Sequence, residues 1–190
     1  MFQAIEEPYI IAEIGGNHEG SLSKAKELLC SAAEAGADAV KFQILSADYL
    51  VNKLEDETRY WHFKRLSLSN DEFFELKSLA DSLQVDFAAS VWDPKAIALF
   101  ADALKFFKVG SGDLNAFPIL RAIALTGKPI ILSTGLANLA EIKRSIDYIC
   151  GLNPIYLNRD SLLLLQCTAL YPTPNSDVNL LAMRALASET

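Results

Sequence analysis

Two lysines, Lys41 and Lys108, lie within short apolar segments whose composition is typical of buried β-strands. A lysine that points into a protein interior is unfavourable unless a negatively charged group meets it. That group is either a strand carboxylate, for which Glu13 is well placed, or an anionic ligand. Because two inward lysines face one plausible inward glutamate, the sequence favours an anionic ligand over a purely structural ion pair. Gln43 lies two residues after Lys41 and shares its face of the strand.

Serines follow the same kind of segment. Ser111 stands between two glycines just after Lys108, and Ser133 begins a Ser-Thr-Gly turn after another apolar segment. Glycine-rich turns expose backbone N–H groups and allow a phosphate to approach closely. Ser90 ends a further apolar segment. Each serine alone is typical of an ordinary turn, but together with the lysines they predict a convergent site for a phosphate or carboxylate.

The two histidines do not form a metal-binding pattern. His18 and His62 are far apart, and neither has a second histidine at i+3 or i+4. We therefore interpret His18 as a residue that stabilises a turn rather than as a metal ligand. The aromatic cluster Tyr60–Phe63 lies in a long segment without a clear pattern, where it acts as a lid, as a partner contact or as the anchor of the segment.

Strand-like segments alternate with amphipathic helices along the chain. Six strands are expected, at Tyr9–Ile14, Ala39–Gln43, Val85–Ala89, Phe106–Val109, Pro129–Ser133 and Leu162–Cys167. Four helices have clear N-caps, at Ser21, Ser69, Asp93 and Asn138. The segment from Leu45 to Leu68 is expected to be irregular, the helix after Asp93 to run through Leu104, and a last helix to begin near Val178.

This alternation predicts an α/β protein with a parallel sheet covered by helices. A doubly wound open sheet and a (β/α)8 barrel of the TIM type both fit. The G-x-G-x-x-G fingerprint of dinucleotide-binding sheets is missing. Polar residues stand at or just past the end of every strand, as a barrel with its site at the carboxyl ends predicts. The sequence therefore favours a barrel, with only about six βα units in this chain.

Composition limits the possible partners. The net charge is −7 and the pI about 4.8, which argues against a general nucleic-acid or anionic-membrane surface but not against an anionic substrate in one cleft. No apolar run is long enough to cross a bilayer. The three cysteines form no close pair, and the first residues lack a basic n-region, so we expect a cytoplasmic location. From the net charge and the short apolar runs, we expect no nucleic acid and no membrane as partners.

An ordered series of motifs resembles the N-acetylneuraminate (sialic acid) synthase family, which includes the legionaminic and pseudaminic acid synthases. The resemblance runs from about Ile10 to the last residue. The matching stretches are Ile11–Gly20, Val40–Gln43, Lys108–Asp113, Gly127–Gly135, Cys167–Thr168, Tyr171–Pro174 and Asp177–Leu180.

The resemblance implies a condensation of phosphoenolpyruvate with an N-acetylated hexosamine, N-acetylmannosamine or a related sugar, to a nine-carbon 2-keto acid and phosphate. It implies that Glu13, Gln43 and Tyr171 contact the sugar, with Glu13 a candidate for proton handling. It further implies a divalent metal, manganese or magnesium, that polarises the aldehyde. The residues implied to hold phosphoenolpyruvate are Lys41, Ser90, Lys108, Ser111 and Ser133. We expect catalysis to depend on Glu13, Lys41 and Lys108.

The sequence departs from the family in three places. Ala89–Asp93 stands where the family usually has Ser-Thr-Pro-Phe, and Ala169 replaces a polar residue after Thr168. The family's two metal-binding histidines lie on strands seven and eight, so no metal ligand is assigned in this chain. We expect residues 1–190 to be one incomplete barrel domain without the family's C-terminal antifreeze-like domain. We expect the isolated chain to be poorly active or inactive, and prone to form a homodimer or otherwise self-associate. The alternative is a non-catalytic truncated barrel that binds phosphoenolpyruvate or a partner chain.

Overall fold

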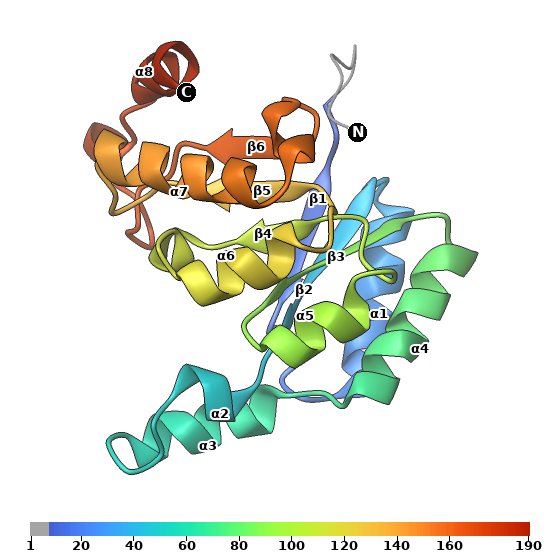
Figure 1. Cartoon of the computed structure of the whole chain (residues 1–190). Coiled ribbons are helices and arrows are strands. Elements are labelled where there is room, and N and C mark those ends of the chain that lie inside the picture. Colours follow the sequence, from blue (N-terminus) through green and yellow to red (C-terminus); the bar gives the residue numbers. More distant parts are fainter. Residues whose placement is uncertain (1–7) are drawn as a thin grey trace. The chain divides into compact units, whose positions relative to one another are not determined.

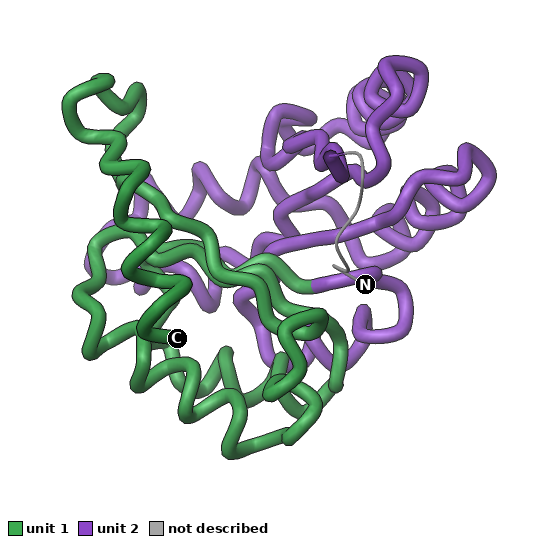
Figure 2. The backbone as a smooth tube through the Cα atoms, turned by 90° about the horizontal axis from the view of Figure 1, so that it is seen from above, with its two compact units in different colours: residues 1–3, 107–190 green, residues 4–106 purple. Residues whose placement is uncertain are grey.

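The computed structural model describes residues 8–190. The described chain divides into two compact units, of which unit 2 ends at Phe106 and unit 1 begins at Phe107 (Figure 2). Each unit contains three β-strands, and the strands within each unit are parallel. The expected alternation of six βα units is confirmed (Figure 1).

Unit 2 has the strand order β1-β2-β3. Its elements are β1 (Ile11–Gly15), α1 (Leu22–Glu34), β2 (Ala39–Ile44), α2 (Ala47–Leu50), α3 (Glu57–Leu66), α4 (Asn70–Ser82), β3 (Asp86–Val91) and α5 (Pro94–Phe100). The expected N-caps at Ser21, Ser69 and Asp93 are confirmed, because each side chain accepts a backbone N–H of its helix.

A cluster of aromatic side chains fills the space between the strands and helices of unit 2. The ring of Phe42 lies 5.5 Å from that of Phe87 and 6.4 Å from that of Phe73. Phe73 in turn meets Phe100 edge to face at 6.0 Å. Because Phe42 points into this core, its neighbours Lys41 and Gln43 point to the opposite face of β2, as the alternation predicts.

Unit 1 has the strand order β4-β5-β6. Its elements are β4 (Phe107–Val109), the 3-10 helix η1 (Ser111–Asp113), α6 (Phe117–Ala124), β5 (Ile130–Ser133), α7 (Leu139–Leu152), η2 (Pro154–Leu157), β6 (Leu162–Leu165), η3 (Asn175–Asp177) and α8 (Ala182–Glu189). Asn138 caps α7 in a capping box with Glu141, as expected. The helices α6 and α7 lie side by side over the strands (Figure 1).

Three expectations about element bounds were wrong. The segment from Leu45 to Leu68 is not irregular but contains α2 and α3; no residue of α3 is buried, so α3 lacks the apolar stripe by which a helix is recognised. The last helix begins at Ala182 rather than near Val178, because Asn179 has φ +50° and interrupts the helical path. The helix α5 ends at Phe100 and a turn follows.

None of the helices in the described part of the chain is long and apolar enough to cross a membrane.

Candidate active site

Glu13 and Lys41 form an ion pair at the carboxyl end of the unit 2 sheet. They are direct neighbours across the parallel ladder of β1 and β2, and Lys41 Nζ meets Glu13 Oε2. The lysine side chain is 10% exposed whereas the glutamate side chain is 52% exposed. The structural ion pair that the sequence left open is therefore formed, with its positive partner buried and its negative partner in reach of solvent.

Gly15 creates the space in which Glu13 and Gln43 gather. Its φ of +56° is a conformation that side chains of L-residues rarely adopt. A Cβ atom at this position would lie 3.0 Å from Glu13 Oε1 and 3.8 Å from Gln43 Nε2. The ladder also shifts register between Glu13 and Gly15, which turns the end of β1 away from a regular strand path.

Ser90 completes the unit 2 group. It is the ladder neighbour of Gln43 on β3, and successive neighbours on a parallel sheet point to the same face. Its side chain is buried, with 6% of the residue exposed. The structure thus brings the four candidate residues of unit 2 to one face at the carboxyl ends of its strands; these are Glu13, Lys41, Gln43 and Ser90.

In unit 1, the side chains of Lys108 and Ser133 are directly hydrogen-bonded. Lys108 Nζ donates to Ser133 Oγ and, at 2.9 Å, to the carbonyl of Val109. Lys108 is the ladder neighbour of Ile131, two residues before Ser133, so the two side chains share a face. The hydroxyl of buried Ser133 therefore lies against the lysine ammonium group.

Ser111 joins this unit 1 group through Gly135. The Gly135 N–H donates to Ser111 Oγ at 3.0 Å. A Cβ at Gly135 would lie 2.9 Å from Ser111 Oγ and 3.0 Å from the Cys167 carbonyl oxygen, so only glycine permits this approach. The neighbouring Thr134 fixes the turn by donating its Oγ1 to the Leu165 carbonyl at 2.9 Å.

Tyr171 is not packed into the unit 1 group. It is 96% exposed, so its side chain makes little contact with the rest of the chain. Its proposed contact with a sugar stays a prediction.

His18 is the residue whose environment the sequence did not reveal. It is fully buried, its Nδ1 accepts the N–H of Gly20 at 3.1 Å, and its ring packs at 6.1 Å from that of Phe42. Its Nε2 has no hydrogen-bond partner among the described residues. Burial lowers the pKa of His18, which keeps the ring neutral. The turn-stabilising interpretation of this histidine agrees with these contacts.

No metal-binding group is present among residues 8–190. Within that range, no three His, Cys, Asp or Glu side chains come together in a way that could hold a metal ion. His18 is a single buried nitrogen donor, and it belongs to no such group among the described residues. The described residues therefore do not fit the divalent metal that the resemblance implies, and no chemical step is assigned to them through it.

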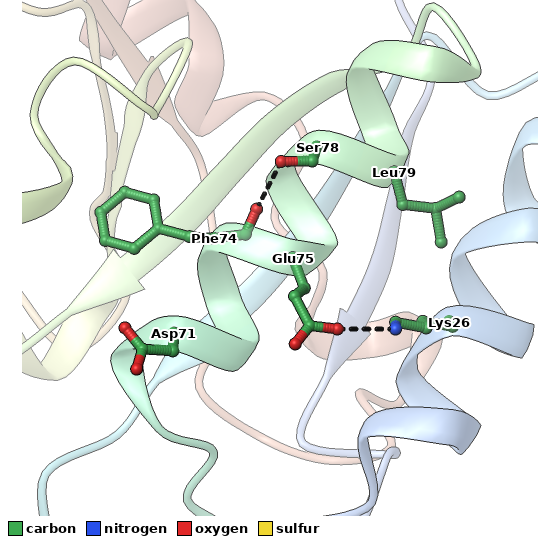
Figure 3. Close-up of a pocket in the computed structure, with 6 residues that line it drawn as sticks. All are labelled: Lys26, Asp71, Phe74, Glu75, Ser78 and Leu79. Carbon is green, nitrogen blue, oxygen red and sulfur yellow. Dashed lines mark hydrogen bonds and ion pairs between the residues drawn. The ribbon is translucent and has the colours of Figure 1, made fainter.

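A surface groove between α1 and α4 is separate from these groups. It has a volume of about 480 Å³, and Lys26 of α1 bridges it to Glu75 of α4 at 2.8 Å (Figure 3). Phe74 and Leu79 supply its apolar wall. Because it lies on the helix layer and contains no strand-end residue, we do not assign it to the candidate site.

Parallel βα units in strict alternation define a protein of the α/β class. Residues 28–190 match the NeuB family, and the chain belongs to this family.

Similar proteins include sialic and legionaminic acid synthases. The chain is 41% identical to N,N'-diacetyllegionaminic acid synthase of Legionella pneumophila over 95% of its own length and 54% of that protein. It is 36% identical to N-acetylneuraminate-9-phosphate synthase of Homo sapiens over 90% of its own length and 50% of that protein. The chain thus spans about half the length of these relatives.

A solved structure supports the fold class. The N-acetylneuraminic acid synthetase of Leptospira borgpetersenii matches with a TM-score of 0.82 and 27% sequence identity, over 96% of this chain and 61% of that chain. The expected α/β fold of the TIM-barrel type, with six βα units in this chain, is confirmed.

Proposed function

We propose that this chain binds phosphoenolpyruvate and supplies that side of a sialic acid synthase-type condensation. The observation that carries the proposal is the group formed by Lys108, Ser111 and Ser133 at the ends of β4 and β5. Phosphate and carboxylate groups are recognised by ammonium groups and hydroxyls, both of which this group contains. The buried Lys41 of unit 2 is a further cation that we propose for anion binding.

The proposed reaction joins phosphoenolpyruvate to the open-chain aldehyde of an N-acetylated hexosamine, such as N-acetylmannosamine. Carbon 3 of phosphoenolpyruvate attacks the aldehyde carbon with the electron pair of its double bond, and the aldehyde oxygen becomes a hydroxyl by taking up a proton. Water then attacks carbon 2, and the tetrahedral intermediate expels phosphate to leave a 2-keto acid. The new bond makes the product a nine-carbon acid.

Each candidate residue has a proposed part in this reaction. Lys41, Ser90, Lys108, Ser111 and Ser133 bind the phosphate and carboxylate groups. Glu13, whose carboxylate is half-exposed, handles the proton, and Gln43 and Tyr171 contact the sugar.

A second candidate function is a non-catalytic chain that binds phosphoenolpyruvate or a partner chain. The two functions share the anion-binding residues and differ in turnover.

Two measurements on the purified chain test the proposal. Calorimetric titration with phosphoenolpyruvate is expected to show saturable binding. Phosphate release from phosphoenolpyruvate, N-acetylmannosamine and manganese is expected to be far slower than for a relative of full length. Binding without any turnover would support the non-catalytic function, and the absence of phosphoenolpyruvate binding would contradict the proposed function.

A further inference from the structure

Lys41 is occupied by Glu13 before any anion arrives. Its Nζ meets Glu13 Oε2, and only 10% of the lysine side chain is exposed. A buried ammonium group has few directions from which a partner can approach it. A phosphate or carboxylate that binds Lys41 therefore competes with the Glu13 carboxylate for the same ammonium protons.

Glu13 has a second position open to it. Its other carboxylate oxygen, Oε1, lies beside Gly15, and the Gln43 amide nitrogen lies beside the same glycine. The Glu13 side chain is 52% exposed, so a carboxylate that leaves Lys41 enters a half-solvated space next to a polar amide rather than an apolar interior. Release from Lys41 thus leaves an ionised hydrogen-bond acceptor beside Gln43.

From this geometry we propose that Glu13 links the two substrates of the site. An anion displaces Glu13 from Lys41, and the released carboxylate then accepts a hydrogen bond from a sugar hydroxyl. The inference rests on the proposed function, because it takes phosphoenolpyruvate as the anion and a polyhydroxy aldehyde as the second substrate.

Two consequences follow from the linkage. The sugar binds more tightly once the anion is bound, and by thermodynamic necessity the anion binds more tightly once the sugar is bound. The favoured order of binding is anion first, because the glutamate that accepts the sugar hydroxyl is held by Lys41 until then. An uncharged residue at position 13 removes the competitor and, with it, the linkage.

Titrations of three forms of the chain test this inference. In the unsubstituted chain, saturating phosphoenolpyruvate is expected to tighten N-acetylmannosamine binding about 10-fold, within the usual range for coupled sites. Glu13→Gln is expected to bind phosphoenolpyruvate about 10-fold more tightly and to bind the sugar equally with and without it. Glu19→Gln is the matched control, because it removes the same charge from the loop that follows β1, where Glu19 is paired with Lys24 at 2.8 Å.

The outcomes separate the linkage from the proposed function. If phosphoenolpyruvate does not bind the unsubstituted chain, the proposed function fails. If it binds but the sugar affinity is unchanged or undetectable at saturation, the linkage is overturned while the anion site stands. The linkage is also overturned if Glu19→Gln raises phosphoenolpyruvate affinity as much as Glu13→Gln, since long-range charge alone would then explain the effect.

Discussion

At the scale of single residues, the two lysines contact different kinds of oxygen atom. Lys41 has a carboxylate partner, Glu13, while Lys108 is held by the Ser133 hydroxyl and the Val109 carbonyl. Neutral oxygens stabilise an ammonium group without cancelling its charge. Hydroxyl and carbonyl oxygens therefore accompany Lys108 where a carboxylate accompanies Lys41.

Replacement of Gly15 by alanine tests the space around Glu13. We expect Gly15→Ala to lower the free energy of unfolding by about 1–2 kcal/mol, because an L-residue is strained at positive φ. Its Cβ would also push Glu13 Oε1, which lies 3.0 Å away. Urea denaturation measures the loss. Gly151→Ala is the control, because Gly151 lies within α7 with open space around it, and we expect it to stabilise by about 0.5–1 kcal/mol.

The buried His18 predicts a pH dependence of stability. Burial lowers its pKa in the folded chain, so the unfolded chain binds a proton at a higher pH than the folded chain does. Its contribution is fully present above the ordinary histidine pKa of about 6.5 and is lost as the pH falls below it. We expect the urea midpoint of His18→Gln to depend less on pH than that of the unsubstituted chain between about pH 7 and 5, the range of ordinary histidine titration. His62 is exposed, and His62→Gln should leave the pH dependence of the urea midpoint unchanged. An equal effect of both variants would contradict the account.

At the scale of elements, the sequence predicted the capping residues but not the helix that buries no side chain, α3. Ser69 and Asn138 are local signals that act through the backbone of the next turn, so they can be read from the sequence. The helix α3 also has a cap, Asp56, but buries no side chain. It contacts α2, where Tyr60 donates a hydrogen bond to Asp48 at 2.9 Å, but such polar contacts leave no periodic apolar pattern.

Removal of the α4 cap, Ser69, and of the α3 cap, Asp56, should therefore have different consequences. Ser69→Ala is expected to lower the free energy of unfolding by about 1 kcal/mol, and with it the urea midpoint. The reason is that α4 buries Phe73, Leu76 and Ala80 in the core. Asp56→Ala is expected to speed amide exchange in α3 without moving the midpoint, because α3 opens without exposing core side chains. Hydrogen exchange and urea denaturation on both variants decide the matter. A fall in midpoint for Asp56→Ala equal to that for Ser69→Ala would contradict it.

At the scale of the whole molecule, the sequence predicted the fold class and the residues at the strand ends. Strict βα alternation permits few architectures, and alternation along a strand decides which face Lys41 and Gln43 share. The sequence left open whether Lys41 pairs with Glu13, because the register that makes the two residues ladder neighbours is set by the sheet. The sequence also could not reveal the contact of Ser111 with Gly135, which joins two turns 24 residues apart.

The leucines of β6 predict self-association. Parallel strands are normally covered on both faces, yet all four leucines of β6 are at least partly exposed. They line a groove of about 420 Å³ with Met183, which is 51% exposed. We expect sedimentation velocity to show concentration-dependent association that Met183→Lys weakens. Leu157→Lys, at an exposed leucine outside the groove, should leave it unchanged.

The central claim is that lysines at the strand ends bind phosphoenolpyruvate. Its most direct test is the affinity for phosphoenolpyruvate, measured by calorimetry, of Lys108→Met against Lys26→Met. Lys26 is a lysine of the α1–α4 groove whose loss changes the net charge equally. We expect Lys108→Met to weaken binding at least about 10-fold, as the loss of one charge-assisted hydrogen bond predicts, and Lys26→Met to leave it unchanged. Equal affinities for both variants would contradict the account.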